Sequence, residues 1–122
     1  MRNDSLLLLV EDEPLVALAL QDTLESAGFR VVIAGNGHDG SAVLQETIQD
    51  IAGLITDIRL GSGPDGWGLA RCARAKRADL PVVYVTGDSA HDFAAEAVPR
   101  SVLVQKPFAP SSMLTALNSV LA

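Results

Sequence analysis

Short apolar runs alternate along the chain with longer stretches in which apolar residues recur every three or four positions. The short runs are residues 5–10, 30–34, 53–57, 82–86 and 101–105. Uninterrupted runs of this length are typical of buried strands in parallel sheets. Helical periodicity predicts helices from Pro14 to Gly28, after Asn36-Gly37, at about 67–77, at 88–97 and from Pro110. This alternation predicts an α/β fold, in which helices cover both faces of a doubly wound parallel sheet.

Four of the predicted strands end on residues suited to phosphate or metal chemistry. These endings are Glu11-Asp12, Asp57, Thr86-Gly87 and Lys106-Pro107. In open α/β sheets, ligands bind beyond the carboxyl ends of the strands. The pattern therefore predicts one site, assembled at one edge of the sheet.

The predicted site has the residue types needed for phosphoryl transfer. Glu11, Asp12 and Asp57 would repel one another without a cation, and carboxylates with room for water suit Mg²⁺. Asp57 ends a rigid strand, where a carboxylate can attack phosphorus. Lys106 offers a point charge and Thr86 a hydroxyl for the phosphoryl oxygens. Glu13 is interpreted as a solvated loop acid.

The ordered set of motifs resembles the receiver domain of the two-component response regulators. The matching segments are residues 10–14 (VEDEP), 57–60 (DIRL), 65–66 (DG), 85–87 (VTG) and 106–108 (KPF). The resemblance implies a (βα)₅ flavodoxin-like fold with strand order 2-1-3-4-5. It also implies that a histidine kinase or histidine phosphotransfer protein transfers a phosphoryl group from phosphohistidine to Asp57.

The same resemblance assigns roles to individual residues. It implies that Mg²⁺ is held by Glu11, Asp12, Asp57 and the backbone carbonyl of Arg59. It implies phosphoryl contacts from Thr86 and Lys106, and a cis peptide bond between Lys106 and Pro107. Phosphorylation would then switch a protein-binding surface, with Gly87, Asp88, Leu103 and Pro107 as the residues that modulate the switch.

The chain departs from the common receiver pattern at Leu103, where many receivers carry Tyr or Phe. This departure puts the usual switch in doubt and is shared by a subgroup of single-domain receivers. Glycines in the loop 61–66 suggest a mobile loop. Arg59 and Asp88 are expected either to pair across the mouth of the site or to be solvated separately. Tyr84 and Trp67 are assigned to packing.

Composition restricts the classes of partner and compartment. The 122 residues carry a net charge of −6, which argues against direct binding of nucleic acid. No apolar stretch reaches the ~20 residues of a membrane span, and no signal peptide is recognisable. Cys72 is the single cysteine, expected to be packed, and a cytoplasmic location is expected. The basic residues of 71–77 are interpreted as a solvated helix end.

The sequence leaves several alternatives open. Residues 1–122 are expected to form a single receiver domain without an output domain, either as a stand-alone protein or as part of a hybrid kinase. A homodimer through the fourth helix, fifth strand and fifth helix is one arrangement considered. The chain is expected to catalyse only its own phosphorylation and dephosphorylation. The rivals are a degenerate receiver that only binds partners and an Asp57-dependent phosphatase, which usually has a second Asp where Arg59 stands.

Overall fold

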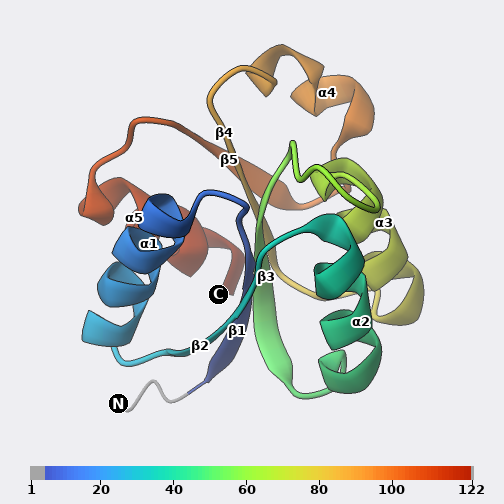
Figure 1. The fold of residues 1–122 in the computed structure, drawn as a ribbon, viewed down its shortest axis with the longest axis horizontal. Helices are drawn as coiled ribbons and strands as arrows, with labels where there is room; N and C mark the ends of the chain where they lie inside the picture. The colour runs from blue at the N-terminus through green and yellow to red at the C-terminus, as the bar shows by residue number, and fades with distance from the viewer. Residues whose placement is uncertain (1–4, 122) are drawn as a thin grey trace.

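A five-stranded parallel sheet forms the centre of the molecule in a computed structural model, which describes residues 5–121 (Figure 1). The strand order β2-β1-β3-β4-β5 confirms the predicted flavodoxin-like topology. The strands are β1 (Leu6–Val10), β2 (Arg30–Ala34), β3 (Ile51–Asp57), β4 (Val82–Thr86) and β5 (Ser101–Gln105). β3 begins two residues earlier than the apolar run predicts.

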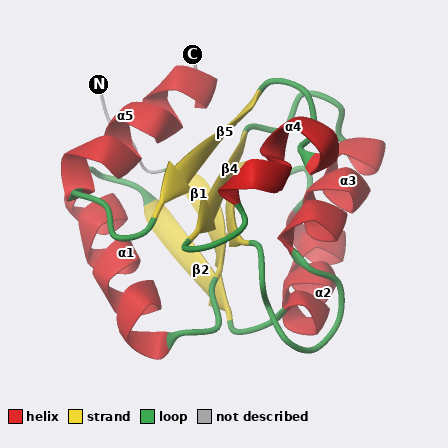
Figure 2. Cartoon of the chain, turned by 90° about the horizontal axis from the view of Figure 1, so that it is seen from above, coloured by secondary structure: helices red, strands yellow, loops and turns green. Residues whose placement is uncertain are grey.

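Helices cover both faces of the sheet, as Figures 1 and 2 show. On one face, α1 (Pro14–Ser26) and α5 (Pro110–Leu121) enclose a core that includes Leu7, Leu9 and Met113. On the other face, α2 (Gly37–Thr47), α3 (Gly66–Lys76) and α4 (Phe93–Glu96) enclose a core that includes Leu8, Leu54 and Tyr84. Side chains of successive strand residues therefore point into the two cores on opposite faces of the sheet. Because both faces are buried, the strands do not alternate between apolar and polar residues.

The register brings the predicted functional strand ends to one edge. Val10 pairs with Thr56, which places the residues after β1 beside the end of β3. Asp57 pairs with Val85, and Thr86 pairs with Gln105. Glu11, Asp57, Thr86 and Lys106 thus lie on neighbouring strand ends, as predicted.

α4 is much shorter than the helix predicted for 88–97. A single 3₁₀ turn, η1 (Ala90–Asp92), precedes the four residues of α4, and Ala97 is already extended at ψ 146°. Within α4, Ala94 to Glu96 are exposed, so they provide no apolar stripe to stabilise a longer helix. Pro99 also disfavours helical geometry in the residue before it.

Arg74 of α3 and Arg77, which follows this helix, bind neighbouring loops, and the interpretation as a solvated helix end missed these contacts. Arg74 donates to the carbonyls of Leu80 at 2.6 Å and Pro99 at 2.6 Å. Arg77 donates to the carbonyl of Ile48 at 3.0 Å and also to that of Ile51. These guanidinium groups therefore supply hydrogen-bond donors to backbone carbonyls of the neighbouring segments.

Two further segments bear on the sequence predictions. The loop 61–66 is docked on the start of α2, because the His38 amide donates to the Ser62 carbonyl at 3.0 Å and Pro64 packs against Gly37. Glycine suits this close approach because it has no Cβ. Cys72 is exposed rather than packed, since the buried stripe of α3 passes through Leu69, Ala70 and Ala73.

Every helix within residues 5–121 is too short or too polar to cross a lipid bilayer.

Candidate functional site

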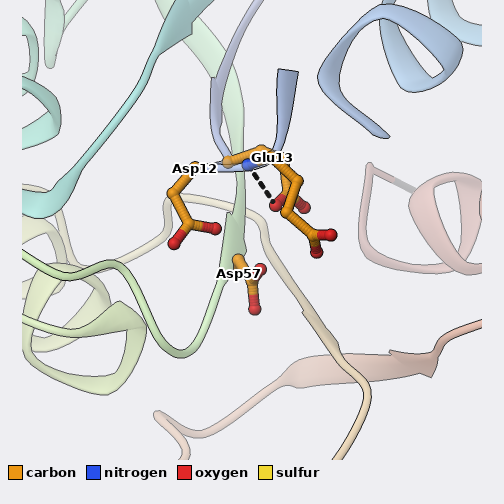
Figure 3. Close-up of side chains that lie close together, drawn as sticks. Asp12, Glu13 and Asp57 are labelled. Carbon is orange, nitrogen blue, oxygen red and sulfur yellow. Dashed lines mark hydrogen bonds between the residues drawn. The ribbon is translucent and has the colours of Figure 1, made fainter. Parts of the chain in front are cut away.

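Four carboxylates converge where β1 and β3 end (Figure 3). One oxygen from each of Glu11, Asp12, Glu13 and Asp57 can be chosen so that all lie within 4.8 Å of one another. Glu11 and Asp57 are buried, with exposed fractions of 2% and 7%, whereas Asp12 and Glu13 are exposed. The sequence predicted three of these acids and dismissed Glu13, which lies with them.

Backbone hydrogen bonds fix the two buried acids. Asp57 Oδ1 accepts from the Ile58 amide at 2.7 Å, so the carboxylate is held by its own chain. Glu11 Oε2 accepts from the Glu13 amide at 3.1 Å, the dashed line in Figure 3. The Glu11 amide in turn donates to the Ala34 carbonyl of β2 at 3.1 Å. The acids are therefore positioned before any ligand arrives.

Lys106 follows β5 and places its ammonium among the carboxylates. Its Nζ donates to Asp57 Oδ2 at 3.0 Å and to Glu13 Oε1 at 3.1 Å, and lies 3.1 Å from Glu11 Oε1. Burial opposes the charged ammonium, but the hydrogen bonds that it donates to Asp57 and Glu13, together with the nearby Glu11 carboxylate, outweigh burial and raise the pKa of Lys106. The Lys106–Pro107 peptide bond is cis, as the receiver resemblance implies.

The environment of Glu11 disfavours the charged form of its carboxyl group. Burial raises the pKa of the Glu11 carboxyl to about 7, and the adjacent negative charge of Asp57 adds to the increase. Glu11 Oε1 is fully buried and accepts no hydrogen bond from the described residues. A divalent cation would favour the ionised carboxylate and would add to the charge of the Lys106 ammonium, which lies 3.1 Å from that oxygen.

The donor set fits Mg²⁺. Mg²⁺ prefers oxygen ligands, and protein sites commonly supply one or two carboxylates while water completes the octahedron. Glu11, Asp12 and Asp57 supply such oxygens. Asp12, Asp57 and Arg59 also line a cleft of about 270 Å³, which leaves room for water beside the carboxylates.

Gly66 lets the loop after β3 return closely over the nucleophile candidate. A Cβ on Gly66 would collide with the Asp57 carbonyl oxygen and approach the Ile58 Cα to 2.9 Å. The Gly66 amide donates to the Ile58 carbonyl at 2.8 Å, and Asp65 caps α3 by accepting from the Gly68 amide at 2.8 Å. The sequence analysis identified the Asp65-Gly66 pair as a motif, but it did not predict that a side chain at position 66 would collide with Asp57.

The Thr86 hydroxyl lies in the turn after β4. Thr86 Oγ1 accepts from the amides of Asp88 at 3.2 Å and Ser89 at 2.9 Å. Thr86 is 1% exposed and is not among the residues that line the cleft, whereas Gly87 is. In this structure the Thr86 hydroxyl oxygen is therefore held by the amides of its own turn.

Arg59 and Asp88 pair across the mouth of the cleft, one of the two arrangements left open by the sequence. Arg59 Nε lies 3.0 Å from Asp88 Oδ2 and 3.1 Å from Oδ1. The hydrogen bond from Ser89 and the charge of Arg59 lower the pKa of Asp88. Both side chains are more than half exposed, so salt should weaken this pair.

Tyr84 lies beside Leu103, the position where an aromatic residue was expected. The two residues are partners in the β4–β5 register, and Leu103 is half-buried against the same core. The Tyr84 ring is fully buried and contacts Trp67 at 4.7 Å and Phe93 at 6.2 Å between ring centroids. Its hydroxyl accepts from the Val98 amide at 3.1 Å. The packing roles predicted for Tyr84 and Trp67 are confirmed.

Comparisons with known proteins agree with this fold and arrangement. The model of the response regulator receiver domain family matches residues 7–118. A solved response regulator receiver protein from Sinorhizobium medicae WSM419 has a TM-score of 0.92 and 36% identity, covering 97% of this chain and 94% of that chain. The C4-dicarboxylate transport transcriptional regulatory protein DctD of Rhizobium meliloti (strain 1021) is 35% identical over 109 residues, covering 87% of this chain. The transcriptional regulatory protein AfsQ1 of Streptomyces coelicolor is 37% identical over 81 residues, or 66% of this chain.

A parallel sheet with acids and a lysine at its carboxyl edge, matched by the family model over most of its length, defines a receiver domain. The chain belongs to the response regulator receiver domain family of two-component signalling. It spans only 34% of AfsQ1 and 23% of DctD, so their activities as whole proteins do not transfer directly.

Proposed function

We propose that this receiver accepts a phosphoryl group on Asp57 in a Mg²⁺-dependent reaction and thereby switches a protein-binding surface. The observation that carries the proposal is the buried Asp57 carboxylate, with Lys106 Nζ at 3.0 Å and three further acids beside it. Phosphoryl transfer needs mainly positioning and charge neutralisation, and both are present.

The proposed reaction assigns a step to each residue. An Asp57 carboxylate oxygen forms a bond to the phosphorus of a phosphohistidine as the phosphorus–nitrogen bond breaks. The electron pair of that bond leaves with the imidazole nitrogen. Lys106 donates a hydrogen bond to a phosphoryl oxygen, and the Thr86 hydroxyl is proposed to reach another after the turn moves.

Glu11, Asp12, Asp57 and the Arg59 carbonyl are proposed to hold Mg²⁺. The metal would supply positive charge that neutralises the phosphoryl oxygens and the carboxylates as they approach. Arg59 and Asp88, paired at the mouth of the cleft, are proposed to restrict the access of water to the acyl phosphate.

The proposed phosphoryl donor is a histidine kinase or a histidine phosphotransfer protein, because two-component receivers are phosphorylated by such partners. Leu15 and Leu18 on α1 are 81% and 58% exposed, and they follow the acids Glu11 to Glu13 closely along the chain. Exposed apolar side chains at such a position suit contact with another protein. The face formed by α4, β5 and α5, which contains Leu103 and lies close to Gly87 and Pro107, is the proposed output surface and the proposed homodimer contact.

Incubation with acetyl phosphate, followed by mass spectrometry of the intact protein, tests this function. We expect a phosphoryl adduct on the wild type that requires Mg²⁺ and is absent from Asp57→Asn. An adduct of equal yield on Asp57→Asn would place the nucleophile elsewhere. No adduct on wild type would favour a receiver that only binds partners, and steady hydrolysis of a generic phosphate ester would favour a phosphatase.

A further inference from the structure

Glu13 is the one acid of the cluster that has no part in the proposed function. Pro14 begins α1 directly after it, and the Glu13 backbone is extended at φ −97° and ψ 109°. Its amide is bound to the buried Glu11 carboxylate at 3.1 Å. The Glu13 side chain therefore projects from a fixed backbone at the mouth of the cleft.

The Lys106 ammonium donates one hydrogen bond to Glu13 and one to Asp57. An ammonium group has three donors. Nζ donates to Glu13 Oε1 at 3.1 Å and to Asp57 Oδ2 at 3.0 Å, while Glu11 Oε1 remains without a hydrogen bond at 3.1 Å. The contact with Glu13 thus holds the ammonium toward the α1 side of the cleft.

The two hydrogen-bond acceptors of Lys106 differ in how easily they can be given up. The Asp57 side chain is 9% exposed, so losing the ammonium would leave a buried carboxylate without its cation. The Glu13 side chain is 62% exposed, so water replaces the ammonium at little cost. A phosphoryl oxygen that enters the cleft should therefore displace Glu13 from Lys106.

We propose that Glu13 is a positioning residue that tethers Lys106 in the unphosphorylated receiver and yields the ammonium to the phosphoryl group. This inference rests on the proposed function and extends it, because Glu13 competes with the phosphoryl group for the Lys106 ammonium. The tether stabilises the unphosphorylated state, so its removal favours the phosphorylated one.

The two lysines of the chain, Lys76 and Lys106, make the tether directly observable. Protein labelled with ¹³C at the lysine ε carbon gives two signals, which Lys76→Arg assigns. In metal-free protein, Glu13→Gln should shift the Lys106 signal, whereas Asp22→Asn, which removes an exposed charge from α1, should not. An unshifted Lys106 signal in Glu13→Gln overturns the proposal.

Beryllofluoride, an acyl phosphate mimic, tests the displacement of Glu13. At saturating Mg²⁺, Glu13→Gln should lower the apparent Kd for beryllofluoride about two- to fivefold, the range expected for loss of an exposed ion pair. Mg²⁺ affinity, measured by calorimetry, should change less. An unchanged or higher Kd for beryllofluoride contradicts the competition.

Glu13→Asp distinguishes a direct contact between Glu13 and Lys106 from a general effect of the negative charge at position 13. It keeps the negative charge but shortens the side chain, so a tether predicts that it behaves like Glu13→Gln. Behaviour like wild type would overturn the tether and assign the effect to the electrostatic field. If the wild type binds no beryllofluoride, the proposed function itself fails, while the metal-free lysine spectra still decide whether the tether exists.

Discussion

At the scale of single residues, the site depends on side chains that the backbone holds in advance. Asp57 and Glu11 each accept a hydrogen bond from a nearby amide, and both are buried. Exposed partners, Asp12 and Glu13, surround them. The buried acids have fixed positions, whereas the exposed acids can exchange partners with water or a ligand.

Gly66 is the residue whose size matters most for this geometry. Gly66→Ala should reduce the free energy of unfolding by about 1–3 kcal/mol, because the new methyl group overlaps backbone atoms of Asp57 and Ile58. Chemical denaturation measures the loss.

Gly87→Ala is the matched control, since a Cβ there meets nothing within 4 Å. Its stability should remain within about 0.5 kcal/mol of wild type. Equal stability of the two variants would contradict the close approach of the loop to Asp57.

The sequence predicted the residues whose role depends on strand position and missed those whose role depends on tertiary contacts. Asp57 and Lys106 were found because carboxyl ends of parallel strands share an edge. Glu13 was missed because an acid after a strand is usually solvated, and nothing in the sequence shows that Lys106 reaches it. The contacts of Arg74 were missed because basic residues are favoured at the C-terminus of a helix by its dipole, so the sequence did not indicate any further role.

At the scale of elements, the aromatic contacts around Tyr84 connect the start of α3, next to the carboxyl edge of the sheet, with the short α4. Trp67 follows Gly66 at the start of α3, Tyr84 occupies the centre of β4, and Phe93 begins α4. The Tyr84 hydroxyl also binds the Val98 amide beyond α4. These contacts place a buried aromatic ring next to Leu103, where the usual switch residue is absent.

Tyr84→Phe tests whether this hydrogen bond holds the segment 93–98. The substitution keeps the ring but leaves a buried amide without an acceptor, so the free energy of unfolding should fall by about 1–3 kcal/mol. Hydrogen exchange within 93–98 should become faster. Unchanged exchange in this segment would show that Tyr84 only fills space.

Element boundaries were predicted well where apolar periodicity was strong and poorly where it was weak. All five strands and the helices α1, α3 and α5 lie close to their predicted ranges. The 88–97 prediction was too long because Ala94, Ala95 and Glu96 offer no buried face. The loop 61–66 was predicted to be mobile from its glycines, and in the structure Gly63 lies so close to the backbone of His38 in α2 that a Cβ there would collide with it.

At the scale of the whole molecule, one edge of the sheet concentrates negative charge in a chain whose net charge is −6. A cation that binds this edge should stabilise the entire fold, because unfolding disperses the carboxylates. At a Mg²⁺ concentration tenfold above its Kd, the stabilisation should be about 1.4 kcal/mol, visible as a higher Tm.

Asp12→Ala provides the control for this linkage. Asp12 is exposed, so its removal should leave the fold intact while abolishing most of the Mg²⁺-dependent rise in Tm. An equal rise in wild type and variant would show that Mg²⁺ acts elsewhere or nonspecifically.

Asp57 is proposed to carry the phosphoryl group, and mapping the modified residue is a direct test of this role. Borohydride reduces an aspartyl phosphate to homoserine, so wild-type protein treated with Mg²⁺ and acetyl phosphate can be reduced, digested and sequenced by tandem mass spectrometry. We predict homoserine at position 57 and not at Asp12. Homoserine at another aspartate, or at none while the intact adduct is present, would contradict the account.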